Sequence, residues 1–397
     1  MIEKDYVIRV HSEPSTVDAA AWNALLAEQV APTPFLRHEY LAALHDSGSA
    51  TPETGWAPQF LTIELNGRLQ AATALYLKSH SYGEYVFDWA WADAYRRHGL
   101  QYYPKLLGAV PFTPVPGTRL LARDAQARQA LADAIGTLAR QGKLSSAHVL
   151  FLDDLDQAAF ERAGWMVRHG VQFHWTQDAQ NPMLDFTDLL SRLQRDKRKK
   201  IQQERRKVAE QGVSFSVHEG AAITLQHWDF FYHCYTLTYE AHHSTPYLTR
   251  DFFSCMALKM AQHWVMFLAH RRDEPIAVSL VAIDAQHKAA WGRYWGSVEP
   301  VSCLHFEACY YQPLAWCLAN GYARFEGGAQ GEHKMARGLL PTPTASAHWL
   351  RDERFAAAVA DFLANEETGI AGYVDELRDR NPFKASVEPP SQPPDRT

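Results

Sequence analysis

The sequence predicts an α+β fold with a mixed sheet, built as two tandem domains of similar element order. One observation is a set of segments that return in the second half in the same order and at nearly constant spacing: Thr33-Pro34-Phe35-Leu36 as Thr245-Pro246-Tyr247-Leu248, the apolar run from Phe60 as the run from Phe267, and Tyr102-Tyr103-Pro104 as Tyr310-Tyr311-Gln312-Pro313. Ordered repeats of this kind indicate a duplicated unit. The other is length, because 397 residues exceed one ordinary hydrophobic core.

The predicted elements follow one order in both halves. Two helices come first, at 22–29 and 228–240 and then directly after each Thr-Pro, where the proline presets the first helical turn. A hairpin follows, at 59–77 with the turn Asn66-Gly67 and at 264–284 with a turn at 272–275. Each half continues with a strand (85–91; 289–295), a helix containing the Tyr-Tyr pair, and a closing strand (148–152; 323–326).

This order divides the chain into three parts. Residues 1–171 are expected to form the first domain, and residues 172–384 a basic helix plus the second domain. The stretch from 186 to 212 is strongly polar and is predicted to be a helical linker. The proline-rich tail, 385–397, is expected to be disordered.

Composition limits the class of protein. The net charge of −6 gives no general reason to expect a nucleic-acid partner. The N-terminus lacks the basic start and apolar stretch of a signal peptide, and no apolar run is long enough to be a transmembrane segment. The five cysteines form no C-x-x-C pair and are interpreted as reduced core thiols. We therefore expect a cytoplasmic protein.

Four segments carry a family resemblance: Gly83-Glu84-Tyr85-Val86-Phe87-Asp88-Trp89-Ala90-Trp91, Tyr102-Tyr103-Pro104-Lys105-Leu106, Pro111-Phe112-Thr113-Pro114, and Phe325-Glu326-Gly327-Gly328-Ala329-Gln330-Gly331-Glu332-His333-Lys334. With them the chain resembles the FemAB-like (peptidoglycan biosynthesis/recognition) branch of the GNAT acyltransferase superfamily, over nearly its whole length. The resemblance implies two tandem GNAT-like domains. It also implies transfer of an acyl or aminoacyl group to an amine, with a cell-wall precursor among the candidate acceptors.

The segment from Phe325 to Leu339 is the first candidate for chemistry. Its glycines allow the backbone to approach a substrate closely, and the predicted substrate-binding residues here are Gly327, Gly328, Gln330 and Gly331. Four predicted catalytic residues then crowd together: Glu332, His333, Lys334 and Arg337. His333 or Glu332 can serve as a base, and the two cations suit a carboxylate, a phosphate or a developing oxyanion. In Fem-type enzymes a lysine of a similar motif helps to position the acceptor, and Lys334 is at the matching place. The alternative is a solvated connecting loop.

The second candidate is the run Tyr95-Arg96-Arg97-His98-Gly99-Leu100. GNAT enzymes have a glycine-containing loop after the corresponding strand, and its amides and the next helix N-terminus hold the coenzyme A pyrophosphate. The resemblance assigns cofactor binding to Arg96, Arg97 and Gly99. The alternative is a basic helix start on the surface.

Further candidates lie on predicted strands and helix starts. Asp88 lies in the predicted strand 85–91, where alternation turns it away from the aromatic face and toward a cleft, so it is a predicted catalytic residue. Arg293 and Tyr294 are at the equivalent place of the second half and are predicted substrate contacts. So are His305 and Glu307, although either can instead cap the next helix.

The basic stretch 192–207 carries nine Lys and Arg against two acidic residues. It is either a solvated helix or a surface for an anionic partner, such as the acceptor arm of a tRNA, a nucleotide-linked precursor or an anionic membrane face. Few aromatic residues lie within it, which argues against base stacking.

Together with the resemblance, the sequence thus predicts an N-acyltransferase. The acceptor is an amine, carried by a small molecule or a peptide, and it attacks the donor substrate directly. The donor is acyl-CoA or aminoacyl-tRNA. Neither a metal nor a tightly bound cofactor is expected, because no metal-ligand spacing or cofactor motif is present. The alternative is a catalytically silent GNAT-like module that recognises an anionic precursor or RNA.

Overall fold

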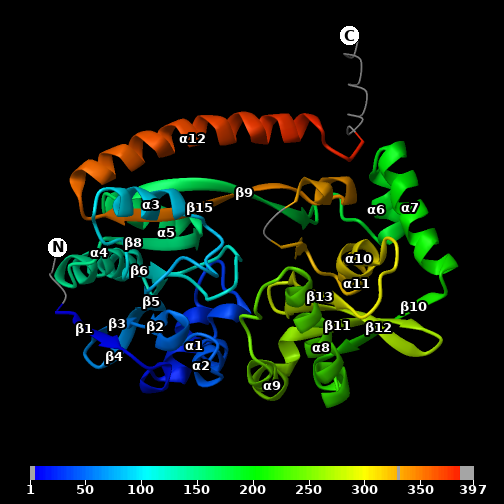
Figure 1. The fold of residues 1–397 in the computed structure, drawn as a ribbon, viewed down its shortest axis with the longest axis horizontal. Helices are drawn as coiled ribbons and strands as arrows, with labels where there is room; N and C mark the ends of the chain where they lie inside the picture. Colours follow the sequence, from blue (N-terminus) through cyan, green and yellow to red (C-terminus); the bar gives the residue numbers. More distant parts are fainter. Residues whose placement is uncertain (1–4, 329–330, 385–397) are drawn as a thin grey trace, which may run out of the picture.

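Two β-sheets and the helices around them form the protein (Figure 1). A computed structural model describes residues 5–328 and 331–384. The predicted site residue Gln330 and the predicted disordered tail 385–397 lie outside the described residues. The larger sheet passes through both halves of the chain in the order β10-β11-β12-β13-β14-β9-β15-β8-β6-β5-β2, and the smaller one has the order β1-β3-β4-β7. The mixed α+β class predicted from the sequence is confirmed.

The strands have these bounds: β1 (Val7–His11), β2 (Trp56–Pro58), β3 (Phe60–Leu65), β4 (Arg68–Thr73), β5 (Leu75–Lys78), β6 (Lys105–Gly108), β7 (Leu121–Ala122), β8 (Ser146–Leu152), β9 (Met166–Thr176), β10 (Val213–Glu219), β11 (Trp264–Arg271), β12 (Glu274–Asp284), β13 (Ala289–Ser297), β14 (Arg324–Glu326) and β15 (Leu340–Leu350).

The α-helices have these bounds: α1 (Ala19–Ala27), α2 (His38–Asp46), α3 (Trp89–Arg97), α4 (Ala125–Gln141), α5 (Asp154–Arg162), α6 (Phe186–Arg192), α7 (Arg195–Glu210), α8 (Leu225–Ala241), α9 (Arg250–Lys259), α10 (Leu304–Phe306), α11 (Gln312–Ala319) and α12 (Glu353–Asp379). Short 3₁₀ turns are η1 (Pro14–Thr16), η2 (Pro34–Leu36), η3 (Pro52–Thr54), η4 (Gly220–Ala222), η5 (Ala261–His263) and η7 (Glu332–Arg337). A π-helical turn, η6 (Glu307–Tyr311), joins α10 to α11.

Both predicted hairpins are present. Asn66 and Gly67 have φ of 52° and 73°, and Arg272 and Asp273 have φ of 51° and 69°. Two consecutive positive φ angles match the twist of antiparallel strands, so the turns pair β3 with β4 and β11 with β12. The helical linker is also confirmed as α6 and α7.

The two halves repeat one topology. In the first half β5 pairs antiparallel with β6, and β6 is parallel to β8 after the intervening helix α4. In the second half β12 pairs antiparallel with β13, and β13 is parallel to β14 after the helical segment α10–α11. A parallel pair needs such a crossover, so the same plan appears twice.

The long strands β9 and β15 join the halves. β9 follows the first half yet pairs with β14 of the second, and β15 follows the second half yet pairs with β8 of the first. The two also pair with each other, antiparallel, over nine residue pairs. The predicted domain boundary at 171/172 falls within β9. One continuous sheet therefore connects the two units through hydrogen bonds.

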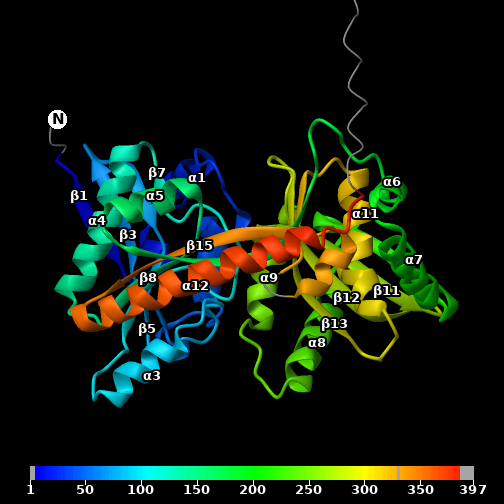
Figure 2. The same cartoon turned by 90° about the horizontal axis from the view of Figure 1, so that it is seen from above.

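Helix α12 lies across this junction. Figure 2 shows it running above β15 from the first half to the second. The side chains that face inward recur at helical spacing and include Val359, Leu363, Val374 and Leu377, all buried. The Arg168 guanidinium on β9 donates to both Glu366 oxygens at 2.8 Å. The apolar stripe and this ion pair fasten the helix to β9 and β15, which we call the exchanged strands because each pairs with the other half of the chain.

Two sequence predictions of secondary structure were wrong. The run 85–91, predicted as a strand, is a bend followed by the start of α3, because Trp91 and Tyr95 are buried at helical spacing while Phe87 and Trp89 are exposed. Tyr102-Tyr103, predicted in a helix, precedes β6 instead. The second-half partner of that pair, Tyr310-Tyr311, does lie in a helical turn.

Candidate functional site

The strands β13 and β14 separate in the second half. They are parallel over three residue pairs, from Ala289↔Arg324 to Trp291↔Glu326. Beyond this point β13 continues to Ser297, while β14 ends at Glu326. The ladder between these two strands therefore ends within the second half, and β13 continues without β14 beside it.

A cavity of about 300 Å³ lies beside this part of β13, and we call it the interdomain cavity. Its walls come from the first half, from α8 and the segment after it, and from β13, and are formed by Tyr85, Phe112, Pro114, Tyr235, Thr238, Tyr239, His242, Ser244, Leu248, Gly292, Arg293, Tyr294, Trp295 and Gly328. None of these residues is acidic. The cavity therefore has aromatic walls and a cation, which suits a ligand with an apolar body and a negative group.

Arg293 occupies a bulge of β13. Leu280 pairs with Tyr294 and Val281 with Gly292, so Arg293 is the extra residue on its strand. Its guanidinium Nη2 donates to the Phe112 carbonyl at 2.9 Å, and Nε has no hydrogen-bond partner in the described part of the chain. The structure places the predicted contacts Arg293 and Tyr294 together in the cavity wall, with Gly328 nearby.

The glycines after β14 have different uses. A side chain at Gly327 would meet Leu339 at 2.7 Å and Tyr310 at 3.0 Å, so this position permits close packing. Gly328 has φ of 90° and lines the cavity. Its carbonyl accepts a hydrogen bond of 2.7 Å from the Lys334 ammonium. Gly331 also has a positive φ, and it directly precedes η7.

Lys334 is buried beside Gly328, which lines the interdomain cavity. Only 2% of its surface is exposed, and no carboxylate among the described residues pairs with it. Burial lowers the pKa of Lys334 to about 8. A buried ammonium without an acidic partner is costly, so its position next to Gly328 marks it as a functional candidate.

The neighbours of Lys334 form a connected group. The Tyr310 hydroxyl and His333 Nε2 are 3.3 Å apart. Burial, together with the charges of Arg337 and Lys334, lowers the pKa of His333. The Arg337 guanidinium is buried, donates to the His333 carbonyl at 2.6 Å and pairs with Glu204 of α7 at 3.1 Å. Arg337 thus braces the loop that carries His333 and Lys334.

Three other predicted residues lie outside the cavity wall. Glu332 accepts a hydrogen bond of 2.6 Å from Tyr373 and pairs with Arg380 at 3.4 Å, so it anchors α12. Glu307 is buried in η6 and pairs with Arg205 of α7 at 3.1 Å. The exposed His305 ring packs against Trp295, whose side chain lines the cavity.

Asp88 is not in a cleft, contrary to the sequence expectation. It is 3% exposed and lies before α3 in a buried network around Lys105, whose ammonium donates to Glu84 at 2.8 Å, to Ser81 at 2.9 Å and to Asp88. The Tyr102 hydroxyl donates to Asp88 at 2.6 Å. Burial raises the pKa of Asp88, but the Lys105 ammonium and His148 outweigh it and hold the pKa well below the usual range.

The predicted pyrophosphate loop does not precede a helix. Arg96 and Arg97 lie in the last turn of α3, and both pair with the Asp93 carboxylate of the same helix. Gly99, with φ of 69°, follows the end of the helix. The expected helix N-terminus was therefore wrong, and binding of coenzyme A by these residues stays a prediction without that support.

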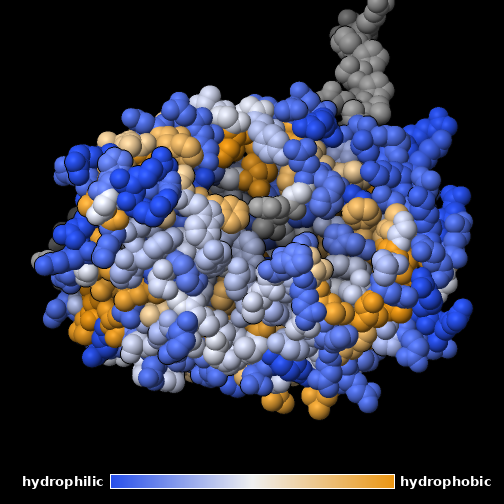
Figure 3. Space-filling model, viewed as in Figure 1, coloured by the Kyte–Doolittle hydropathy of each residue, from blue (hydrophilic) through white to orange (hydrophobic). Residues whose placement is uncertain are grey.

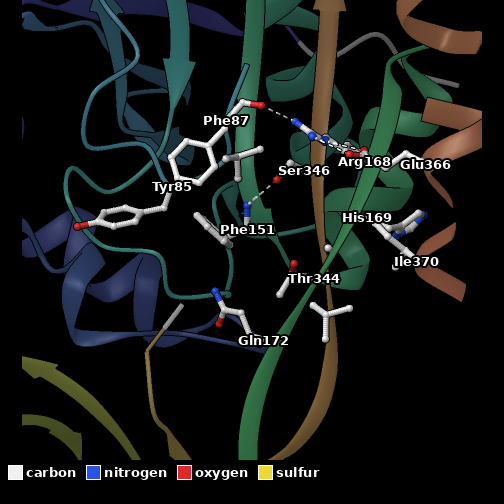
Figure 4. Close-up of a pocket in the computed structure, with 13 residues that line it drawn as sticks. Tyr85, Phe87, Phe151, Arg168, His169, Gln172, Thr344, Ser346, Glu366 and Ile370 are labelled. Carbon is white, nitrogen blue, oxygen red and sulfur yellow. Dashed lines mark hydrogen bonds and ion pairs between the residues drawn. The ribbon is translucent and has the colours of Figure 1, made fainter. Parts of the chain in front are cut away.

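A second cavity, of about 250 Å³, lies beneath α12, and Figure 4 shows the residues around it. Gln172, Thr344 and Ser346 line it from the exchanged strands, and the Arg168–Glu366 pair closes one side. Tyr85, whose φ is 65°, lines both this cavity and the interdomain cavity. Tyr85 is thus common to the walls of both cavities.

The basic helix α7 presents its charges outward. Arg195, Lys199, Lys200, Arg206 and Lys207 are exposed. Figure 3 shows a continuous hydrophilic surface on the side of the molecule where α6 and α7 lie. The inner face of the helix, through Glu204 and Arg205, contacts the loop and the π-helical turn described above.

Sequence reasoning did not single out several residues of the cavity and of the group around Lys334. Tyr235 and Tyr239 are four residues apart on α8, so helical spacing would place them on one face. Phe112 entered only through the resemblance, and Tyr310 only as part of the repeat. Glu204 gave no local signal, because its partner Arg337 is far along the chain.

None of the helices in the described residues is both long and apolar enough to cross a bilayer. No curated protein matches the chain in sequence.

Solved structures share the fold. L-PGS from Bacillus licheniformis has 11% sequence identity and a TM-score of 0.55, with 90% of this chain and 98% of that chain covered. FemX has 10% identity and a TM-score of 0.55, with 87% and 98% covered. At these identities the similarity concerns the fold. A family model described as peptidoglycan biosynthesis/recognition matches residues 13–385, and the chain therefore belongs to the FemAB-like family.

Proposed function

We propose that this protein is an acyltransferase that moves an acyl or aminoacyl group onto an amine in the interdomain cavity. The observation that carries the proposal is the cavity beside β13 and Gly328, together with the buried Lys334, which has no acidic partner in the described residues and donates to the Gly328 carbonyl. A reacting carbonyl needs such a cavity beside a positive group. Membership of the FemAB-like family supports a cell-wall precursor as acceptor.

Lys334 stabilises the developing oxyanion in this proposal. Its ammonium is held at 2.7 Å from the Gly328 carbonyl, so its direction is fixed before the reaction. A preorganised positive donor in a site with little water stabilises the transition state more than the ground state. Arg337 contributes as a positioning residue, because it holds the His333 backbone and Glu204 together.

His333 is the proposed base. Its lowered pKa keeps the imidazole neutral near pH 7, and Tyr310 fixes the ring from one side. The acceptor ammonium gives one proton to this base, and the neutral amine adds to the donor carbonyl to form the C–N bond. As the C–S bond of a thioester or the C–O bond of an aminoacyl ester breaks, His333 returns its proton to the departing thiol or hydroxyl, and the nitrogen loses its second proton to water.

The donor is either acyl-CoA or aminoacyl-tRNA. Five exposed basic residues of α7 support the second, since such a surface suits a polyanion, and the same helix contacts the Lys334 loop through Glu204. Arg96, Arg97 and Gly99 remain the proposed coenzyme A contacts, but two of them are already paired with Asp93. We favour aminoacyl-tRNA on this ground.

Thermal unfolding with each donor class tests the proposal. A ligand at about 100 times its dissociation constant stabilises the native state by about 2.7 kcal/mol. Aminoacyl-tRNA should raise the unfolding temperature more than the same tRNA without its aminoacyl group, because only the charged form places a group in the cavity. Substitution Tyr239→Ala should remove that difference, and the matched change Tyr232→Ala, outside the cavity, should retain it. Equal shifts for both RNAs together with no shift by acetyl-coenzyme A would refute the proposed donor site.

A catalytically silent recognition module is the second candidate. It is favoured by the position of Arg96 and Arg97 at a helix C-terminus, where no pyrophosphate cradle forms. Such a module would bind its ligand without turnover, so a measurable transfer rate would exclude it.

A further inference from the structure

The exposed aromatic side chains of the protein gather in one place. Of the twelve tryptophans, all in the described residues, Trp89 is the exposed one, and of the seventeen tyrosines, also all described, it is Tyr82. Their exposed fractions are 40% and 58%, and that of Phe87, which lies between them in the sequence, is 52%. The Tyr82 and Trp89 ring centroids are 5.0 Å apart. We call Tyr82, Phe87 and Trp89 the aromatic surface.

The backbone under this surface is held by β9 and α12. The Arg168 guanidinium on β9 donates to the Phe87 carbonyl at 2.7 Å and to the Glu366 carboxylate, as Figure 4 shows. Its central carbon is 6.0 Å from the ring centroid of Phe362 on α12, the remaining exposed aromatic residue of the described chain. The bend is thus fixed through its backbone while its aromatic rings stay exposed. Exposed apolar groups gathered in this way mark an interaction site.

The outer face of α3 leads from Trp89 to two cations. Asp93 lies one turn after Trp89 on the same side of the helix. Arg96 and Arg97 lie on that side one turn further on. Their side chains are 80% and 68% exposed, and both pair with the Asp93 carboxylate. Two arginines share one acid, so this face carries an excess of one positive charge.

More basic side chains follow the end of the helix. Leu100, which is exposed, lines a surface cavity of about 370 Å³ together with the exposed residues Lys143 and Arg351. Asp352 also lines this cavity, and its carboxylate is paired with Arg354. The exposed cations here outnumber the neighbouring carboxylates. We call four of them the basic edge: Arg96, Arg97, Lys143 and Arg351.

A lipid bilayer is the partner that matches both features. Trp and Tyr rings have an apolar body and a polar edge, and such side chains are enriched at the level of lipid headgroups. Basic side chains beside them attract anionic headgroups. Figure 2 shows α3 at the edge of the molecule, where its outer face can reach a flat surface. We propose that the aromatic surface and the basic edge bind the face of an anionic bilayer, with the Phe87 and Trp89 rings inserted among the headgroups.

Sedimentation with lipid vesicles tests the inference on the full-length protein. One set of vesicles is phosphatidylcholine alone, and the other contains phosphatidylserine as well. The protein should bind the second set at millimolar lipid. The partition coefficient should be at least about fivefold lower for the first set, because each basic residue near an anionic surface contributes about that factor.

Two double variants separate the rings from the charges. Phe87→Ser with Trp89→Ser should lower the partition coefficient at least about tenfold, because the two apolar rings no longer leave water. Arg96→Gln with Arg97→Gln should abolish the preference for phosphatidylserine. Leu184→Ser is the matched control and should bind as the wild type does, since Leu184 is exposed and lies just before α6. All five side chains are exposed, so the variants should keep the unfolding temperature of the wild type.

Trp89 also reports its own insertion. In the bound wild type, lipids with brominated chains should quench part of the tryptophan fluorescence, because Trp89 is the exposed tryptophan. Trp89→Phe keeps a ring at this position, so it should bind about as well as the wild type and lose that quenching.

Four results would overturn the inference. One is no sedimentation with either kind of vesicle, and another is unchanged binding in both double variants of the surface. The third is loss of binding in Lys199→Gln with Lys200→Gln but not in those variants, which would place the contact on α7. The last is a dimer that the ring variant dissociates, because a second copy would then cover the surface. Vesicle binding needs neither donor nor acceptor, so its failure would leave the proposed acyl transfer untouched.

Discussion

Replacing Lys105 by Met tests the interpretation of Asp88 as part of a structural network. Lys105 is fully buried, and its ammonium is shared by Ser81, Glu84 and Asp88. Methionine has a similar length and no charge, so the substitution leaves two buried carboxylates without their cation. Removing one partner of a buried ion pair costs about 3–5 kcal/mol.

The expected loss depends on pH in a defined direction. Burial raises the pKa of Glu84 to about 7 even with Lys105 present, so Glu84 can become neutral in the variant. The pKa of Asp88 is held low in the wild type, so its contribution to stability is present above its unfolded pKa and is lost as the pH falls through the folded pKa. The variant lacks that contribution. The Asp88 contribution is present at both pH 8 and pH 5, so the change between them comes from Glu84, which is charged at pH 8 and neutral at pH 5 in the variant. The difference in unfolding free energy between wild type and variant should therefore be about 3 kcal/mol or more at pH 8 and smaller at pH 5.

Urea unfolding followed by circular dichroism measures this difference. The exposed Lys259 is the control, because Lys259→Met removes a lysine charge at the surface. The triple variant with Glu84→Gln and Asp88→Asn should recover most of the loss, since it removes the orphaned charges as well. A loss below about 1 kcal/mol at pH 8, or no recovery in the triple variant, would refute the reasoning.

Three further outcomes are expected. The pKa of Lys334 is lowered to about 8, so its ammonium loses its charge as the pH rises above that value. Turnover should therefore fall above about pH 8 in the wild type but not in Lys334→Arg. Identical pH profiles of the two proteins would contradict this prediction. Glu366→Gln removes the charged acceptor of the Arg168 ion pair and should speed hydrogen exchange of the α12 amides about fivefold. That factor corresponds to a loss of about 1 kcal/mol in the free energy of local opening. Unchanged exchange would show that the apolar stripe alone holds the helix. The double variant Lys199→Gln, Lys200→Gln should reduce the magnitude of the slope of log RNA affinity against log salt concentration by about 1.4, because each phosphate contact contributes about 0.7. An unchanged slope would exclude α7 as the surface that contacts RNA.

The sequence predicted the elements whose signals are local. The Asn66-Gly67 turn, the helical spacing in α8 and the polar linker before the second half each depend on neighbouring residues, and all are present. The run 85–91 failed because alternating aromatics in a short segment fit a strand and the first turn of a helix equally well. The helix buries both Trp91 and Tyr95, which lie four residues apart, and this burial favours the helix over a strand.

The exchanged strands could not be predicted in the same way. β9 and β15 carry polar residues and prolines, such as Arg168, Gln172 and Pro343, and their pairing joins segments far apart in the sequence. The candidate site was anticipated in part. Arg293, Tyr294 and Gly328 come together in one wall, whereas Asp88 and Glu332 are held elsewhere by Lys105 and Tyr373.

Transfer of a radiolabelled acyl group tests the central claim most directly. The protein is mixed in excess over aminoacyl-tRNA, and separately over acyl-CoA, with a set of acceptor amines that includes amino acids and short peptides. The labelled amide is measured over time. The account predicts amide formation from one of the two donors. It also predicts a rate about 10²–10³ times lower for Lys334→Met, the cost of removing one donor to an oxyanion. Amide formation at the wild-type rate by Lys334→Met, or no amide from either donor with any amine, would contradict it.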